Sequence, residues 1–123
     1  MKLVKKLLMA SAVSALIATS SFANHQGEKK VDMVKMGEKI FNTKKIGNCL
    51  ACHAISGKNI DNPGSLGPDL ATAKYYPKEM LFGMIYDIYK EKNITTSAMP
   101  AFGKNGQLSD KEIDALVAYL TAE

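Results

Sequence analysis

The sequence predicts a small all-α fold of about three to five helices in a single domain. Apolar residues recur at three- and four-residue spacing in residues 32–43, 77–90 and 109–120, as they do in helices with one buried face. The segments between them are rich in glycine, proline and asparagine, which favour turns. No internal repeat and no linker interrupts this pattern, so we expect one domain over residues 32–123.

The N-terminus is typical of a secretion signal, and we expect residues 1–23 to be removed as a signal peptide. A basic start precedes an apolar stretch over residues 7–18, and Ser21-Phe22-Ala23 fits a cleavage site with small residues. The alternative is a retained membrane anchor, but the stretch is shorter than the roughly 20 residues that span a bilayer. We therefore expect export to the periplasm, a flexible leader over residues 24–31, and no integral membrane segment after signal removal.

The net charge gives no support for nucleic-acid binding. The full chain has 16 basic and 12 acidic residues, a formal net charge of +4. Three of the lysines belong to the predicted signal, which leaves 13 bases against 12 acids and a net charge of +1. The chain has no arginine, so it lacks bidentate phosphate clamps. We therefore expect no nucleic acid among its partners.

The first predicted helix covers residues 32–43, with Asp32 as its N-cap. Its apolar face consists of Met33, Met36, Gly37, Ile40 and Phe41. A glycine inside a helix costs about 1 kcal/mol relative to alanine, so we interpret Gly37 as a point where another helix approaches closely. Tyr119 of the last predicted helix is a candidate for this contact.

Residues 47–54 hold the most informative motif, the run Cys49-Leu50-Ala51-Cys52-His53. Its pattern, C-x-x-C-H, is the attachment signal of a c-type haem, in which two thiols become thioethers and the histidine binds the iron. If the segment is helical, Cys49, Cys52 and His53 share one face and point at the same ligand. We therefore predict one covalently bound haem c, whose apolar ring would add buried surface to a small core.

Three other interpretations of the two cysteines are weaker. A thioredoxin-like pair needs a βαβ context, and no such pattern flanks the motif. A zinc site needs two further ligands, and the only other histidine, His25, lies beside the predicted cleavage site. A disulfide between Cys49 and Cys52 would close a very short loop and add little stability.

Residues 56–69 form a predicted irregular loop that ends in Gly67-Pro68. The proline carbonyl there could accept a hydrogen bond from the ring N–H of His53. Such a bond would fix the tautomer of the histidine and raise its basicity as a ligand. The alternative is a simple turn with no role at the haem.

The two remaining predicted helices have clear start signals. Pro77 suits the first position of the helix over residues 77–90. The last helix begins at Ser109, which forms a capping box with Glu112. Their buried stripes are Met80, Leu81, Met84, Ile85 and Ile88 in the first, and Ile113, Leu116, Val117 and Leu120 in the second.

A second axial ligand would complete the coordination of the iron. The candidates are His25, Met33, Met36, Met80, Met84 and Met99, besides water or no ligand. Helical methionines are more often packing residues, whereas Met99 lies in the long loop over residues 91–108, directly before Pro100. We assign Met99 as the sixth ligand; the alternative is a methionine packed against the haem edge. His/Met ligation leaves no open position for a substrate, which favours one-electron transfer.

These motifs together resemble a class I cytochrome c. A narrower resemblance is to the SoxX family, the small monohaem subunits of periplasmic thiosulfate-oxidising SoxAX cytochromes. It rests on the segments Gly47–His53, Pro63–Pro68, Tyr76-Pro77, Met99–Gly103 and Glu112–Leu120. The resemblance implies a class I cytochrome c fold, with Cys49 and Cys52 as the haem thioethers and His53 and Met99 as the axial iron ligands. Asp69 departs from the family pattern, which favours an apolar residue or proline after Gly67-Pro68.

The SoxX resemblance also implies a function. Such a chain is the electron-transfer subunit of L-cysteine S-thiosulfotransferase and pairs with a larger c-type cytochrome subunit, SoxA. Thiosulfate is joined oxidatively to a cysteine of a sulphur-carrier protein at the partner's haem. The small subunit takes up the released electrons and passes them to a downstream cytochrome, so we expect no catalytic residue in this chain. Two alternatives are a free periplasmic monohaem electron carrier and a thiol–disulfide protein without haem.

Overall fold

The structure, a computed structural model, describes residues 20–123, with side chains from residue 26 onward. Most of the predicted signal peptide and the side chain of His25 therefore lie outside the described residues. The described part of the chain is helical and contains no strand, which confirms the all-α prediction. Its elements are the α-helices α1 (Ser20–Asn42), α2 (Lys78–Tyr86), α3 (Ile88–Lys92) and α4 (Asp110–Leu120), and the 3-10 helices η1 (Cys49–Ala51) and η2 (Leu70–Tyr75).

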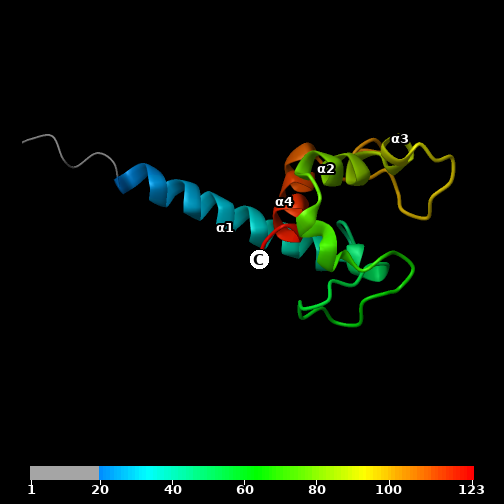
Figure 1. The fold of residues 1–123 in the computed structure, drawn as a ribbon, viewed down its shortest axis with the longest axis horizontal. Helices are drawn as coiled ribbons and strands as arrows, with labels where there is room; N and C mark the ends of the chain where they lie inside the picture. Colours follow the sequence, from blue (N-terminus) through cyan, green and yellow to red (C-terminus); the bar gives the residue numbers. More distant parts are fainter. Residues whose placement is uncertain (1–19) are drawn as a thin grey trace, which may run out of the picture.

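Helices α1 and α4 cross at the centre of the core (Figure 1). Gly37 makes the close crossing possible, because a Cβ atom there would overlap the carbonyl oxygen of Ala115 and lie 2.7 Å from the Cβ of Tyr119. One turn further on, Phe41 is fully buried, with its ring 5.6 Å from the ring of Tyr119. The predicted contact between the two helices is thus confirmed.

Helix α1 begins earlier than predicted. The sequence predicts an N-cap at Asp32, but the helix runs continuously from Ser20. The flexibility of the leader over residues 24–31 stays a prediction. Residues 28–30 are a glutamate and two lysines, which form helices readily and offer no stop signal. The side chains of residues 26–32 are exposed, and this end of α1 extends away from the rest of the domain (Figure 1).

The single helix predicted over residues 77–90 is two helices, α2 and α3. They separate at Asp87, whose backbone leaves the helical conformation with φ −151° and ψ 87°. Its carboxylate caps α3 by accepting a 3.4 Å hydrogen bond from the N–H of Lys90. The same carboxylate forms a 2.9 Å ion pair with Lys104. Local capping and a distant partner thus override the apolar periodicity.

Helix α4 follows the prediction closely. Ser109 Oγ accepts a 3.4 Å hydrogen bond from the N–H of Glu112, and the Glu112 carboxylate accepts a 2.8 Å bond from the N–H of Ser109. This capping box lowers the pKa of Glu112, with the Ser109 N–H as the main cause. The predicted stripe of Ile113, Leu116, Val117 and Leu120 is buried. Within residues 20–123, no helix has both the length and the apolar character needed to cross a membrane.

Candidate haem site

The C-x-x-C-H motif forms one tight turn that starts at η1. Asn48 precedes the turn in the left-handed conformation, with φ 52°. The N–H groups of Cys52 and His53 both donate to the Cys49 carbonyl, at 3.1 and 2.9 Å. The three predicted haem-binding side chains therefore come from a single turn, as the spacing requires.

Cys49 and Cys52 are not joined by a disulfide and lie partly buried. Burial raises the pKa of the Cys49 thiol to about 11. Reactive redox cysteines have the opposite property, a lowered pKa that favours the thiolate. The environment of Cys49 therefore disfavours the thiol–disulfide alternative.

His53 is oriented by the loop that follows the motif. Its ring Nδ1 lies 2.8 Å from the carbonyl oxygen of Pro68. Because a carbonyl only accepts, Nδ1 carries the proton in this bond and Nε2 is the nitrogen left to bind a metal. The predicted hydrogen bond from His53 to the proline carbonyl is confirmed.

The loop over residues 56–69 is tied to the motif by backbone hydrogen bonds. Three bonds of 2.8 Å join Gly64 N–H to the Leu50 carbonyl, Gly67 N–H to the Cys52 carbonyl and Leu70 N–H to the Ala54 carbonyl. Gly67 also lies directly against the imidazole, where a Cβ atom would be 2.6 Å from Nδ1 of His53. The loop therefore packs on the histidine and is more than a simple turn.

Asp69 closes this loop, a role that its departure from the family pattern does not predict. Its Oδ1 accepts hydrogen bonds from the N–H groups of Ser56, at 3.0 Å, and Ala71, at 2.8 Å. Its Oδ2 accepts from the Ser56 hydroxyl. These bonds lower the pKa of Asp69, with the Ser56 hydroxyl as the largest cause. An aspartate directly before a helical segment is a common N-cap, and this signal could have revealed its role.

Met99 lies in the loop between α3 and α4, half-buried against the hydrophobic core. Its N–H donates a 3.0 Å hydrogen bond to Ser97 Oγ, which fixes the backbone just before Pro100. Among the other candidate ligands, Met33, Met36 and Met84 pack against the same core from helices. The assignment of Met99 as the sixth ligand stays a prediction.

The surroundings of the motif fit an apolar macrocycle. A group of apolar side chains packs against the core but keeps part of its surface uncovered: Cys49, Leu50, Ile60, Leu70, Met84, Met99 and Phe102. They come from the motif, the loop after it, η2, α2 and the Met99 loop. A flat apolar ring covers such surfaces and would turn these half-buried side chains into core residues.

Comparison with known proteins identifies the family. Residues 32–120 match the family model described as cytochrome c oxidase, cbb3-type, subunit III. The chain therefore belongs to this family of c-type cytochromes. It is 33% identical over 84 residues to cytochrome c6 of Leptolyngbya boryana, a match covering 68% of this chain and 85% of that protein.

A solved structure gives a more detailed likeness. A chain in the crystal structure of SoxXA from P. pantotrophus matches with a TM-score of 0.61 and 26% sequence identity. The match covers 71% of this chain and 78% of that chain. The predicted class I cytochrome c fold with SoxX-like character is thereby confirmed, and membership of the family implies a covalently bound haem c. The chain is a haem protein for electron transfer.

Proposed function

We propose that this chain is the electron-accepting haem subunit of a SoxAX-type L-cysteine S-thiosulfotransferase. The observation that carries the proposal is the likeness to a chain of SoxXA over 71% of the sequence. The proposed partners are a larger SoxA-like c-type cytochrome, a sulphur-carrier protein and a downstream cytochrome. The proposed location is the periplasm, reached through the signal peptide at residues 1–23.

Each residue of the site would have a distinct role in binding one haem. Cys49 and Cys52 would hold the ring through thioether bonds, and His53 would bind the iron through Nε2. The Pro68 carbonyl keeps the proton on Nδ1, 2.8 Å away, and so raises the basicity of the bound histidine. When bound, the haem supplies one-electron cycling between Fe(III) and Fe(II).

Met99 would complete the coordination of the iron and so decide the kind of chemistry. With both axial positions filled, neither oxygen nor thiosulfate has a vacant position on this iron, and a thioether ligand raises the reduction potential. Both features suit an electron acceptor and argue against catalysis at this haem. In this proposal the sulphur–sulphur bond forms on the partner, and this chain removes the electrons.

A ligand substitution tests the site. Met99→Ala should abolish the sulphur–iron charge-transfer band of the oxidised protein and lower the reduction potential, because the iron loses its thioether. Met33→Ala is the matched control, since Met33 is a half-buried methionine on α1. Absorption spectra and potentiometric titration measure both properties. Survival of the band in Met99→Ala would rule out this ligand.

A reconstitution tests the function. The holoprotein should co-purify with the larger cytochrome, and thiosulfate should reduce its haem only when that cytochrome and the carrier protein are both present. A second candidate, a free periplasmic electron carrier, is favoured by the 33% identity to cytochrome c6. That candidate would be supported by a monomeric holoprotein whose haem stays oxidised in the complete mixture.

A further inference from the structure

The loop that carries Met99 is anchored before this residue. The hydroxyl of Tyr89, on α3, donates a 3.2 Å hydrogen bond to the Ser97 carbonyl. The hydroxyl oxygen of Ser97 then accepts the 3.0 Å bond from the N–H of Met99. Met99 is thus held two residues after an anchor point on α3.

The loop is also anchored after Met99, on the end of α2. Phe102 N–H donates to the Ile85 carbonyl at 3.1 Å, and Lys104 N–H donates to the Tyr86 carbonyl at 3.0 Å. Gly103 lies between these bonds against the ring of Tyr86, where a Cβ atom would be 2.7 Å from ring carbons. Only residues 98–101 lie between the anchor on α3 and the anchors on α2.

The break at Asp87 makes these downstream anchors available. In an uninterrupted α-helix, the carbonyls of Ile85 and Tyr86 would accept from the N–H groups four residues later. Asp87 ends α2, and its side chain takes the N–H of Lys90 instead. The two carbonyls are thus released to bind the loop that carries Met99.

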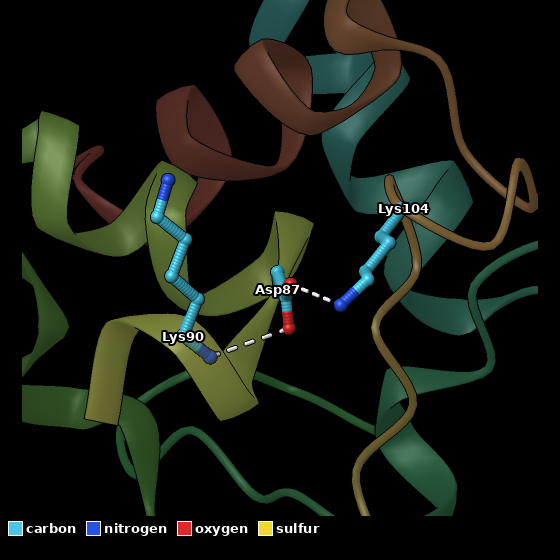
Figure 2. A network of polar contacts seen from close by, with 3 residues as sticks. All are labelled: Asp87, Lys90 and Lys104. Atoms are coloured by element: carbon cyan, nitrogen blue, oxygen red, sulfur yellow. Dashed lines mark hydrogen bonds and ion pairs between the residues drawn. The ribbon is translucent and has the colours of Figure 1, made fainter. Parts of the chain in front are cut away.

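An ion pair fastens the loop at the same point. The Nζ of Lys104 lies 2.9 Å from Oδ2 of Asp87, while Oδ1 accepts from the backbone of Lys90 (Figure 2). Asp87 is buried, with 7% of its surface exposed, and is the one charged residue in the core of the described chain. A buried carboxylate needs a partner to stay charged. The hydrogen bond from Lys104 lowers the pKa of Asp87, and Asp87 in turn raises the pKa of Lys104.

We propose that Asp87 and Lys104 are positioning residues for the axial ligand Met99, holding its loop on the α2–α3 corner so that the sulphur stays on the iron. The inference rests on the proposed ligation by Met99. Neither side chain touches the iron in this account. The ion pair holds residues 102–104 on α2 and thereby restrains Met99. Its contribution can be measured as a change in the strength of the sulphur–iron bond.

The test uses the purified holoprotein and substitutions that keep size and capping. Asp87→Asn removes the charge but retains an amide oxygen that can cap α3, and Lys104→Gln removes the cation. The control is Lys90→Gln, which removes the same charge from a lysine whose side chain points away from Asp87 (Figure 2). Far-UV circular dichroism and covalent haem content establish that each variant is folded.

The readout is the ease with which added imidazole displaces the thioether. Imidazole should bind about threefold more tightly to Asp87→Asn and Lys104→Gln than to the wild type. The charge-transfer band should be lost at correspondingly lower imidazole concentration. The double variant should resemble the single variants, because the two residues act through one contact. Lys90→Gln should match the wild type.

Three outcomes would overturn the proposal. Wild-type imidazole affinity in both folded variants would show that the pair does not restrain the ligand. An equal effect of Lys90→Gln would assign the change to net charge alone. A wild type without the charge-transfer band would remove the Met99 ligation itself, and this failure is distinguishable because it appears before any substitution is made.

Discussion

Two neighbouring residues of the haem loop, Pro68 and Asp69, hold the histidine in place. The Pro68 carbonyl binds Nδ1 of His53, and the Asp69 carboxylate binds Ser56, three residues after the histidine. Adjacent residues therefore clamp both the ring and the backbone of the haem segment. Asp69 is unusual for the family pattern at the sequence level, but its contacts give it a clear structural role.

Asp69 should also make stability depend on pH. Its folded-state pKa is lowered by the Ser56 hydroxyl and backbone bonds, so its contribution is fully present above the unfolded-state pKa of about 3.9. The contribution is lost as the pH falls through the lower folded-state value. Asp69→Asn should therefore be less stable than the wild type at pH 7, and the difference should shrink in acid.

Urea denaturation of the holoproteins between neutral and acid pH measures this difference. Asp61→Asn is the control, because Asp61 is an exposed aspartate of the same loop whose carboxylate accepts only from its neighbour Asn62, at 3.1 Å. That variant should follow the wild-type curve. A stability difference for Asp69→Asn that does not change with pH would assign the effect to packing instead of to the carboxylate charge.

Among the elements, the crossing of α1 and α4 was predictable because its signals are local. Gly37 lies on an apolar helix face, and the capping box at Ser109 fixes where α4 begins. The break at Asp87 was not predictable from periodicity. Its charge partner, Lys104, is far along the chain, and the apolar stripe continues through the break. The division into α2 and α3 thus depends on a tertiary contact, the ion pair of Asp87 with Lys104, which the local apolar pattern does not reveal.

In the candidate haem site, too, some features could be predicted from the sequence and others depend on tertiary contacts. The motif is local in the sequence, whereas its hydrogen bond to Pro68, 15 residues after His53, follows from known ligand chemistry; both are present in the structure. The clamp by Asp69 and the anchors of the Met99 loop join residues that no local pattern relates. The start of α1 differs from the prediction at Asp32 because residues 28–30 are good helix formers, and their polarity does not end a helix.

The helix crossing predicts a large effect for one added methyl group. Gly37→Ala should destabilise the holoprotein by about 1–3 kcal/mol, the usual cost of overpacking a core, because its Cβ would meet the Ala115 carbonyl. Gly27→Ala is the control on the same helix, where a Cβ atom would have no neighbour within 4 Å. The free energy of unfolding in urea measures both. A neutral Gly37→Ala would show that α1 and α4 can separate without cost.

At the scale of the whole molecule, the haem is expected to be part of the core. A domain of about 100 residues buries only a limited apolar surface by itself. The buried side chains gather mainly between α1, α2 and α4, whereas the apolar side chains around the motif and the Met99 loop are only half-buried. The haem ring would cover these half-buried side chains. The stability of the fold should therefore depend on the bound haem.

Removing both thioether attachments tests this dependence. The double variant Cys49→Ala/Cys52→Ala, produced in a host that matures c-type haem, should yield little coloured protein. The remaining apoprotein should have lower helicity and a lower melting temperature than the wild-type holoprotein, because the half-buried apolar surface stays exposed to water. Far-UV circular dichroism and thermal melts measure both properties. Cys49→Ala alone is the control, since it retains Cys52, His53 and the Met99 loop and should stay coloured. A colourless double variant with full helicity and an unchanged melting temperature would show that α1, α2 and α4 form a sufficient core without the haem.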